Sequence, residues 1–432
     1  MGSHHGSEAP LTEEQRRNRS RAQRLLLAVL IPIALATAVG AWLLWPSADR
    51  PDFQIKDPYA TTTGISVDEG EVVRTDRGVC PSSQVSGTDP QSVDPATQPQ
   101  CLIAYTRPAA GGFDVAVEVS REVEKADAPD VGDRIKYLNY AEVAGPGASG
   151  YMFVDYVRDV PIILLAIVYA FVVVAVARWR GLRAMIGLFG AYLVLAYFII
   201  PAIMEGKDPI LVGLVGSMLI MIGALYFAHG FSARTSTALL GTLFGLLTIT
   251  ALSSWAISAI HLTGLGDENT YKLINSTDQF TIRSVILCGL IIAGLGVLND
   301  VTITQASAVW ELHELAPHES ARRLFAGAMR IGRDHIASTV YTIAFAYAGA
   351  ALPLLIIVSM YDPGFTSSLT GGVLAEEVVR TLVGSIGLVL AIPVTTFIAV
   401  LVVKAVSPRA SAPSDLAPSD LAAPTRSGRH RR

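Results

Sequence analysis

Long apolar stretches recur along the chain, and they constrain its fold more than any other feature. Eight of them are long enough to cross a bilayer, whose hydrocarbon core takes about 20 helical residues. They lie at residues 25–45, 161–177, 184–204, 209–228, 235–260, 282–305, 336–360 and 379–403. The bilayer interior contains no water to form hydrogen bonds with backbone N–H and C=O groups. Such stretches therefore cross it as helices, in which these groups bond to one another. The sequence therefore predicts a polytopic α-helical membrane protein with about eight transmembrane helices.

The composition agrees with this class and excludes others. Only 16% of the 432 residues are charged and 51% are hydrophobic, whereas soluble domains have about 25% charged residues. A net charge of −4 gives no basic surface for nucleic acid. We expect the lipid bilayer as surroundings, no nucleic-acid partner and no cofactor.

Arginine residues mark one side of the membrane. Five of them lie between residues 16 and 24, directly before the first apolar stretch, and Trp42 and Trp45 end that stretch. Further arginine clusters follow the second and sixth stretches and end the chain, and Arg234 follows the fourth stretch. By the positive-inside rule this predicts a multi-pass protein of the bacterial cytoplasmic (inner) membrane, with N- and C-termini cytoplasmic. The alternative for the first stretch is a cleaved signal peptide, but its long apolar core favours a retained anchor.

These features divide the chain into five segments. We predict a cytoplasmic basic N-terminal segment (1–23), a first transmembrane helix (24–45), an extracytoplasmic β-rich domain (46–155), a seven-helix membrane domain (156–405) and a disordered cytoplasmic tail (406–432). The tail repeats Ala-Pro-Ser-Asp-Leu, a composition that cannot build a packed core.

The polar region between the first and second apolar stretches has the pattern of short strands. Residues 70–75, 113–119 and 131–138 alternate apolar and polar residues and are separated by Gly, Pro, Ser and Asp clusters. The pattern predicts a small extracytoplasmic β-barrel or β-sandwich.

Two cysteines bracket a polar loop in this region. Cys80 and Cys101 enclose residues 81–100, and an oxidising compartment would let them pair. We predict a disulfide between them, which would stabilise the domain by about 3 kcal/mol. Two unpaired surface thiols are the alternative.

An acidic residue lies inside the sixth apolar stretch. An Asp at the bilayer centre costs roughly 2.5–3.5 kcal/mol, so Asp300 calls for a role. In the predicted topology the polar ends of the sixth and seventh stretches face each other in the cytoplasmic half. Carboxylates, an imidazole, an amide and hydroxyls together suit a proton relay or a hard-cation site. The candidate ion- or proton-binding residues are Asp300, Asn299, Thr304, Asp334 and His335.

Structural roles are the alternative for these residues. Asp334 follows Arg330 by four positions, the spacing of an ion pair on one helix. Asp300 could serve as an interhelical hydrogen-bonding residue.

Two motifs that resemble catalytic signatures do not have the required context. His313 and His318 are five residues apart, whereas the zincin helix needs them four apart, and Pro317 interrupts the helix. The Gly-x-Gly-Asp sequence at 264–267 falls in a predicted external loop instead of a span. We therefore expect that the protein is not an enzyme.

Three further segments carry a family resemblance. They are Gly-Val-Leu-Asn-Asp-Val-Thr-Ile-Thr-Gln at 296–305, Gly-Ala-Met-Arg-Ile-Gly-Arg-Asp-His at 327–335, and the stretch from residue 336 to 354. With them the region from about residue 150 to 405 resembles the YibE/F family of multi-span bacterial membrane proteins. The resemblance implies an architecture and brings no settled activity, although transport is a common suggestion for the family.

The leading hypothesis from the sequence is a permease or exporter of a small solute or ion that uses the polar cluster on the sixth and seventh helices. The alternative is a membrane scaffold or sensor whose external β domain binds a partner in the envelope. The sequence specifies neither the substrate nor the oligomeric state.

Overall fold

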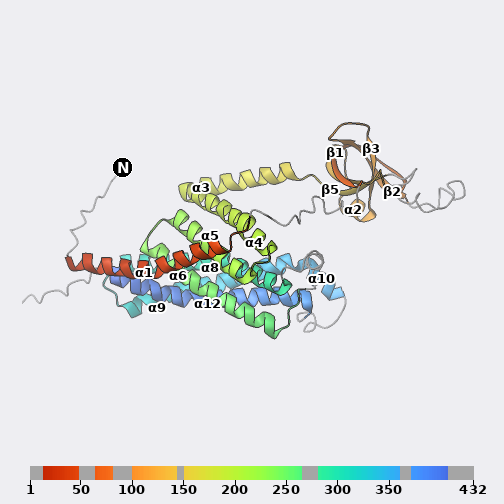
Figure 1. Cartoon of the computed structure of the whole chain (residues 1–432). Helices are drawn as coiled ribbons and strands as arrows, with labels where there is room; N and C mark the ends of the chain where they lie inside the picture. The colour runs from red at the N-terminus through yellow and green to blue at the C-terminus, as the bar shows by residue number, and fades with distance from the viewer. Residues whose placement is uncertain are drawn as a thin grey trace, which may run out of the picture. The chain divides into compact units, whose positions relative to one another are not determined.

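Figure 1 shows the computed structural model of the chain, which describes residues 13–47, 64–80, 100–143, 150–264, 281–360 and 371–406. The chain divides into two compact units, one formed by Pro51–Val176 and the other by Met1–Arg50 together with Ala177–Arg432. The predicted tail beyond residue 406 and the predicted loop at 81–99 lie outside the described residues.

The smaller unit contains a closed barrel of five strands. These are β1 (Ser66–Val79), β2 (Gln100–Pro108), β3 (Val115–Val119), β4 (Arg134–Asn139) and β5 (Tyr151–Tyr156), with the short helix α2 (Arg121–Ala126) between β3 and β4. Neighbouring strands follow the order β1-β2-β3-β5-β4, and β1 pairs with β4 to close the ring. Among the described strands, the β3–β5 pairing is parallel and the other four pairings are antiparallel. The predicted β-rich domain is confirmed, and its strand order is that of an OB-fold barrel.

Alternation along the strands separates the two faces of the barrel. The fully buried side chains of Val72, Ala104, Val117, Val119, Ile135 and Tyr137 fill its interior. Residues of the opposite phase lie on the outer face, where Cys101 and Ile103 of β2 form a second, smaller buried cluster with Cys80.

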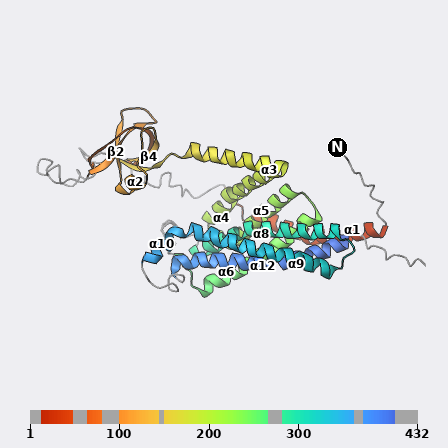
Figure 2. The same cartoon turned by 180° about the vertical axis from the view of Figure 1, so that it is seen from behind.

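The larger unit is a bundle of long helices, shown from the opposite side in Figure 2. Helix α3 spans Asp159–Val194, and its part from Ala177 onward belongs to this unit. The other elements are α1 (Glu13–Leu43), the π-helical turn η3 (Leu195–Ile199), α4 (Ile200–Met204), α5 (Pro209–His229), α6 (Ala233–Ala259), α8 (Ile282–Leu315), α9 (Ala321–Ala350), α10 (Leu352–Met360) and α12 (Gly372–Val406). Helices α6, α8 and α12 pack against one another, α5 lies against α8, and α9 lies against α12 and α8. Helix α1 packs on α12 and α5.

Several of these helices begin at a polar residue that caps the free backbone N–H groups of the first turn. Asp208 Oδ1 accepts hydrogen bonds of 2.9 Å from the backbone N–H groups of Ile210 and Leu211 at the start of α5. Ser232 and Ser320 cap α6 and α9 in the same way. Each cap contributes about 1 kcal/mol and places the start of its helix.

Glycines allow the central helices to approach closely. A Cβ at Gly241 of α6 would lie 2.0 Å from Thr395 Oγ1 of α12, and one at Gly245 would lie 2.3 Å from Leu298 Cδ2 of α8. Helix association in membranes depends on such small residues, because lipid tails are as apolar as leucine side chains. The packing of α6 on α8 and α12 therefore depends on these two positions.

The described residues contain six helical stretches that are long and apolar enough to cross a membrane, or seven if the bent pair α9–α10 is one span. The chain is thus a helical membrane protein, but this count is below the predicted eight. Two differences explain the count: the apolar runs at 161–177 and 184–204 join into one stretch, Asp159–Met204, and the run at 336–360 is divided between α9 and α10. Only Arg178, with φ 54° and ψ −134°, departs from helical geometry between the first two of these runs. The 62° bend between α9 and α10 lies next to Pro353, which cannot donate the helical hydrogen bond.

Candidate functional site

The structure brings two of the predicted site residues together. His335 of α9 and Asp300 of α8 approach to 3.8 Å between Nε2 and Oδ2. The backbone carbonyl of His335 also accepts a hydrogen bond of 2.9 Å from Thr339 Oγ1, one turn further along α9. Because α8 packs on α9, residues 35 positions apart in the sequence meet where the predicted polar ends of the two helices were expected to meet.

The two partners have different surroundings. The Asp300 side chain is 68% exposed and that of His335 is 28% exposed. His335 Nε2 itself is buried and makes no hydrogen bond to any described residue. The pair is ionic only when the imidazole carries a proton. This arrangement can accept a proton at His335 and hold it next to a carboxylate.

Asn299 precedes Asp300 in the chain but faces a different part of the bundle. Its side chain lines a cavity of about 430 Å³ between the second half of α3, η3, α5 and α8. Most of the wall is apolar, and Tyr192, His229 and Asn299 bring polar groups to it. Asn299 Oδ1 is buried and has no hydrogen-bond partner among the described residues. The residue as a whole is only partly buried, and its amide is one of the few polar groups in the cavity wall.

Thr304 and Asp334 do not join the pair. Both side chains are exposed, and neither makes a hydrogen bond or an ion pair with another described residue. The considered ion pair between Arg330 and Asp334 is also not formed within the described part of the chain. The five predicted residues thus separate into the Asp300–His335 pair, Asn299 at the cavity, and two side chains outside both.

A buried polar network that the sequence reasoning did not single out lies further along α8. Gln305 of α8, only 2% exposed, donates hydrogen bonds from Nε2 to Ala328 O of α9 at 2.9 Å and to Thr396 Oγ1 of α12 at 2.7 Å. One turn before it, Thr302 bonds Thr242 of α6 at 2.7 Å. The network connects α8 to three other helices, α6, α9 and α12. An amide and a hydroxyl three residues apart inside an apolar stretch were the signal that could have identified it.

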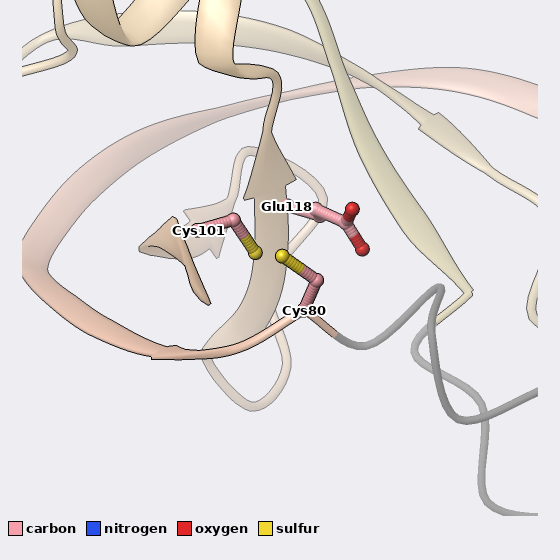
Figure 3. Close-up of side chains that lie close together, drawn as sticks. All are labelled: Cys80, Cys101 and Glu118. Carbon is pink, nitrogen blue, oxygen red and sulfur yellow. The ribbon is translucent and has the colours of Figure 1, made fainter. Parts of the chain in front are cut away.

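In the barrel unit, Cys80, Cys101 and Glu118 lie close together, with the two sulfur atoms directed toward one another (Figure 3). One ligand atom from each of the three residues lies within 4.8 Å of the others. The disulfide between Cys80 and Cys101 stays a prediction. Burial raises the pKa of the Cys101 thiol, and the Cys80 side chain and the negative charge of Glu118 raise it further.

The chain was compared with known families, curated proteins and solved structures. The family model described as YibE/F-like protein matches residues 165–405, which is more than half of the sequence. The chain belongs to the YibE/F-like family. No curated protein and no solved structure matches it. The matched region of this YibE/F-like protein contains Asn299, Asp300, His335 and nearly all of the cavity-forming helices, and it leaves the barrel outside.

Proposed function

We propose that this YibE/F-like protein is a permease of the bacterial cytoplasmic membrane that moves a small organic solute together with a proton. The solute occupies the cavity between α3, α5 and α8, and the Asp300–His335 pair carries the proton. We propose no catalytic role for any residue.

The observation that carries the proposal is the cavity itself, whose wall includes Asn299, a residue with an amide oxygen that has no hydrogen-bond partner among the described residues. Binding sites for small molecules are mostly apolar and hold a few placed polar groups, and about 430 Å³ is within their usual range of roughly 300–1,000 Å³. The π-helical turn η3, which contributes Leu195 to the wall, adds to this, because π-helical insertions occur frequently at functional sites.

The next residue on the same helix supplies the chemistry for coupling. Ionisable residues at membrane depth are expensive, and in transporters they commonly relay protons. Asp300 and His335 are one carboxylate and one imidazole at 3.8 Å, the kinds of group from which such relays are built. Since Asn299 and Asp300 are adjacent on α8, a shift of this helix on binding would act on both sites.

We further propose eight passes with both termini in the cytoplasm, with Arg178 separating two passes of the Asp159–Met204 stretch. An even number of passes is required if the N- and C-termini share one side, whereas seven would place them on opposite sides. Reporter fusions at residues 60, 320 and 425 test this. The proposal predicts an external signal at 60 and cytoplasmic signals at the other two, and a cytoplasmic signal at 60 would overturn it.

Metabolite and metal profiling of a deletion strain, followed by complementation, tests the function. Asp300→Asn keeps the size of the side chain and its hydrogen bonding but removes the charge. It should insert normally and fail to restore the profile. The matched control is Glu314→Gln, the same acid-to-amide change at an exposed position of α8 outside the site. Full complementation by Asp300→Asn at normal expression would refute proton coupling and favour the scaffold or sensor hypothesis.

A further inference from the structure

Three metal-binding side chains meet on the outer face of the barrel. Ligand atoms of Cys80, Cys101 and Glu118 all lie within 4.8 Å of one another. Among the described residues this is the only group of three or more His, Cys, Asp and Glu side chains with that geometry. Figure 3 shows the two sulfur atoms directed toward one another, with the Glu118 side chain beside them.

The pairing of three neighbouring strands produces this convergence. Cys101 pairs with Gly78 near the end of β1, two residues before Cys80. Glu118 of β3 pairs with Ile103 of β2, which is two residues after Cys101 and therefore on the same face. Cys101 and Glu118 are thus held by paired strands, and Cys80 directly follows the end of β1, so strand register determines where the three side chains meet.

The surroundings of the sulfurs differ from those of surface thiols. Cys80 is 7% exposed and Cys101 is 4% exposed, and both pack in one cluster with Ile103. Glu118 is half-buried beside them. Such a shell limits solvent access and strengthens the attraction of the site for a cation. This cluster lies on the outer side of β2 and β3, the face with which OB-fold barrels bind their ligands.

We propose that Cys80 and Cys101 in their reduced form, together with Glu118, bind one Zn²⁺ ion. Two thiolates select a thiophilic metal, and the carboxylate oxygen favours Zn²⁺ over Cu⁺. A tetrahedral Zn²⁺ with Zn–S distances of about 2.3 Å holds its sulfurs roughly 3.8 Å apart, so the donors need only a small closure to meet it. Binding releases the two thiol protons to solvent, and water or a further side chain completes the fourth position.

This proposal is independent of the proposed permease function, and it defines the relation of the site to the predicted disulfide. A disulfide brings the sulfurs to about 2.05 Å and removes both thiolates. The metal site and the disulfide are therefore alternative states of the same two sulfur atoms, and only the reduced protein binds Zn²⁺.

The test uses the full chain purified in detergent with a phosphine reductant and stripped of metal by a chelator. We expect about one Zn²⁺ per chain by elemental analysis after dialysis, and a thiolate-to-cobalt charge-transfer band when Co²⁺ is used as the probe. Cys80→Ser and Cys101→Ser should each weaken Zn²⁺ binding by more than about 100-fold, and Glu118→Gln by at least about tenfold, since even residues that only orient metal ligands contribute 10–100-fold. Cys288→Ser is the matched control and should bind as the wild type does, because Cys288 is buried in α8 of the other unit.

A second readout needs no variant of the site. Zn²⁺ should protect Cys80 and Cys101, but not cysteines of the denatured chain, from alkylation by N-ethylmaleimide, as mapped by mass spectrometry. Prior oxidation of the protein to the disulfide should abolish Zn²⁺ binding. Reduced, monodisperse protein that binds no Zn²⁺, or that binds it equally after either cysteine is replaced, would overturn the proposal. A disulfide that the reductant opens only on unfolding would overturn it as well.

Discussion

The clearest quantitative test of the helix packing is the substitution of Gln305. This amide lies 2% exposed between α8, α9 and α12 and donates two hydrogen bonds. Interhelical hydrogen bonds in membrane proteins contribute about 0.6 kcal/mol on average and about 1.7 kcal/mol at most. Gln305→Leu keeps the volume and removes both bonds. In this variant Thr396 Oγ1 still donates to Ile392 O at 2.7 Å. The free energy of unfolding should therefore fall by about 1 kcal/mol, near the lower end of the range for two such bonds.

Gln305→Glu should be worse, although it changes the shape less. A carboxylate has no N–H group, so it would face the oxygens of Ala328 and Thr396 with an acceptor. A buried charge without a partner costs at least about 3 kcal/mol or forces the group to become neutral. The difference of about 2 kcal/mol between the two variants corresponds to roughly a 30-fold change in the unfolding equilibrium.

Thermal unfolding of the detergent-purified chain, followed by gel filtration after heating, measures the relative stabilities of the wild type, Gln305→Leu and Gln305→Glu. Thr304→Val is the control, because Thr304 is the preceding residue but is exposed and should change stability by no more than about 0.5 kcal/mol. The reasoning is refuted if Gln305→Glu is as stable as Gln305→Leu, or if Gln305→Leu behaves as the control does.

Two further predictions concern packing and the cysteines. Gly241→Ala should destabilise the bundle by about 1–3 kcal/mol, because the new Cβ would lie 2.0 Å from Thr395 Oγ1, whereas Gly289→Ala, with no atom within 4 Å, should be neutral or stabilising in the same melting assay. If both alanine variants melt alike, close packing at Gly241 is wrong. Non-reduced peptide mapping of protein from freshly isolated membranes should find the Cys80–Cys101 disulfide, and quantitative alkylation of both thiols there would contradict that prediction.

The helical part of the fold followed from length and composition wherever an apolar run stood alone. The run at 209–228 corresponds to α5, Pro209–His229. The run at 282–305 begins with α8, but the helix continues to Leu315. The extension packs on other helices, as Val309 illustrates, which is 0% exposed in a cluster with Leu324, Ala328 and Ala399. Hydropathy alone cannot detect such packing partners.

The strand β2 shows why the barrel was only partly predictable. Its sequence, Gln100–Pro108, does not alternate, and Ile103 and Ala104 are consecutive buried residues. Ala104 faces the barrel interior and Ile103 faces the outer cysteine cluster, so both faces of the strand are covered. A period of two appears only when one face meets water.

The location of the candidate site was predictable from the sequence, but which residues belong to it was less so. An acid inside an apolar stretch identified Asp300, and the structure brings His335 to it. Spacing does not say how a helix is rotated toward its neighbours, so Thr304 was included although it lies outside the pair. Gln305 is five residues from Asp300, about 140° around the helix, and it lies in the core instead.

The account depends most on a water-accessible cavity at Asn299, and cysteine accessibility measures this directly. In a chain whose native cysteines are replaced by serine, Asn299→Cys should react in intact membranes or inverted vesicles with a membrane-impermeant thiosulfonate, which modifies thiolates in water. Leu298→Cys, at a position that is 0% exposed and packed against Gly245, should not react. A solute-filled cavity predicts labelling at 299 alone, and equal absence of labelling at both positions would contradict the permease.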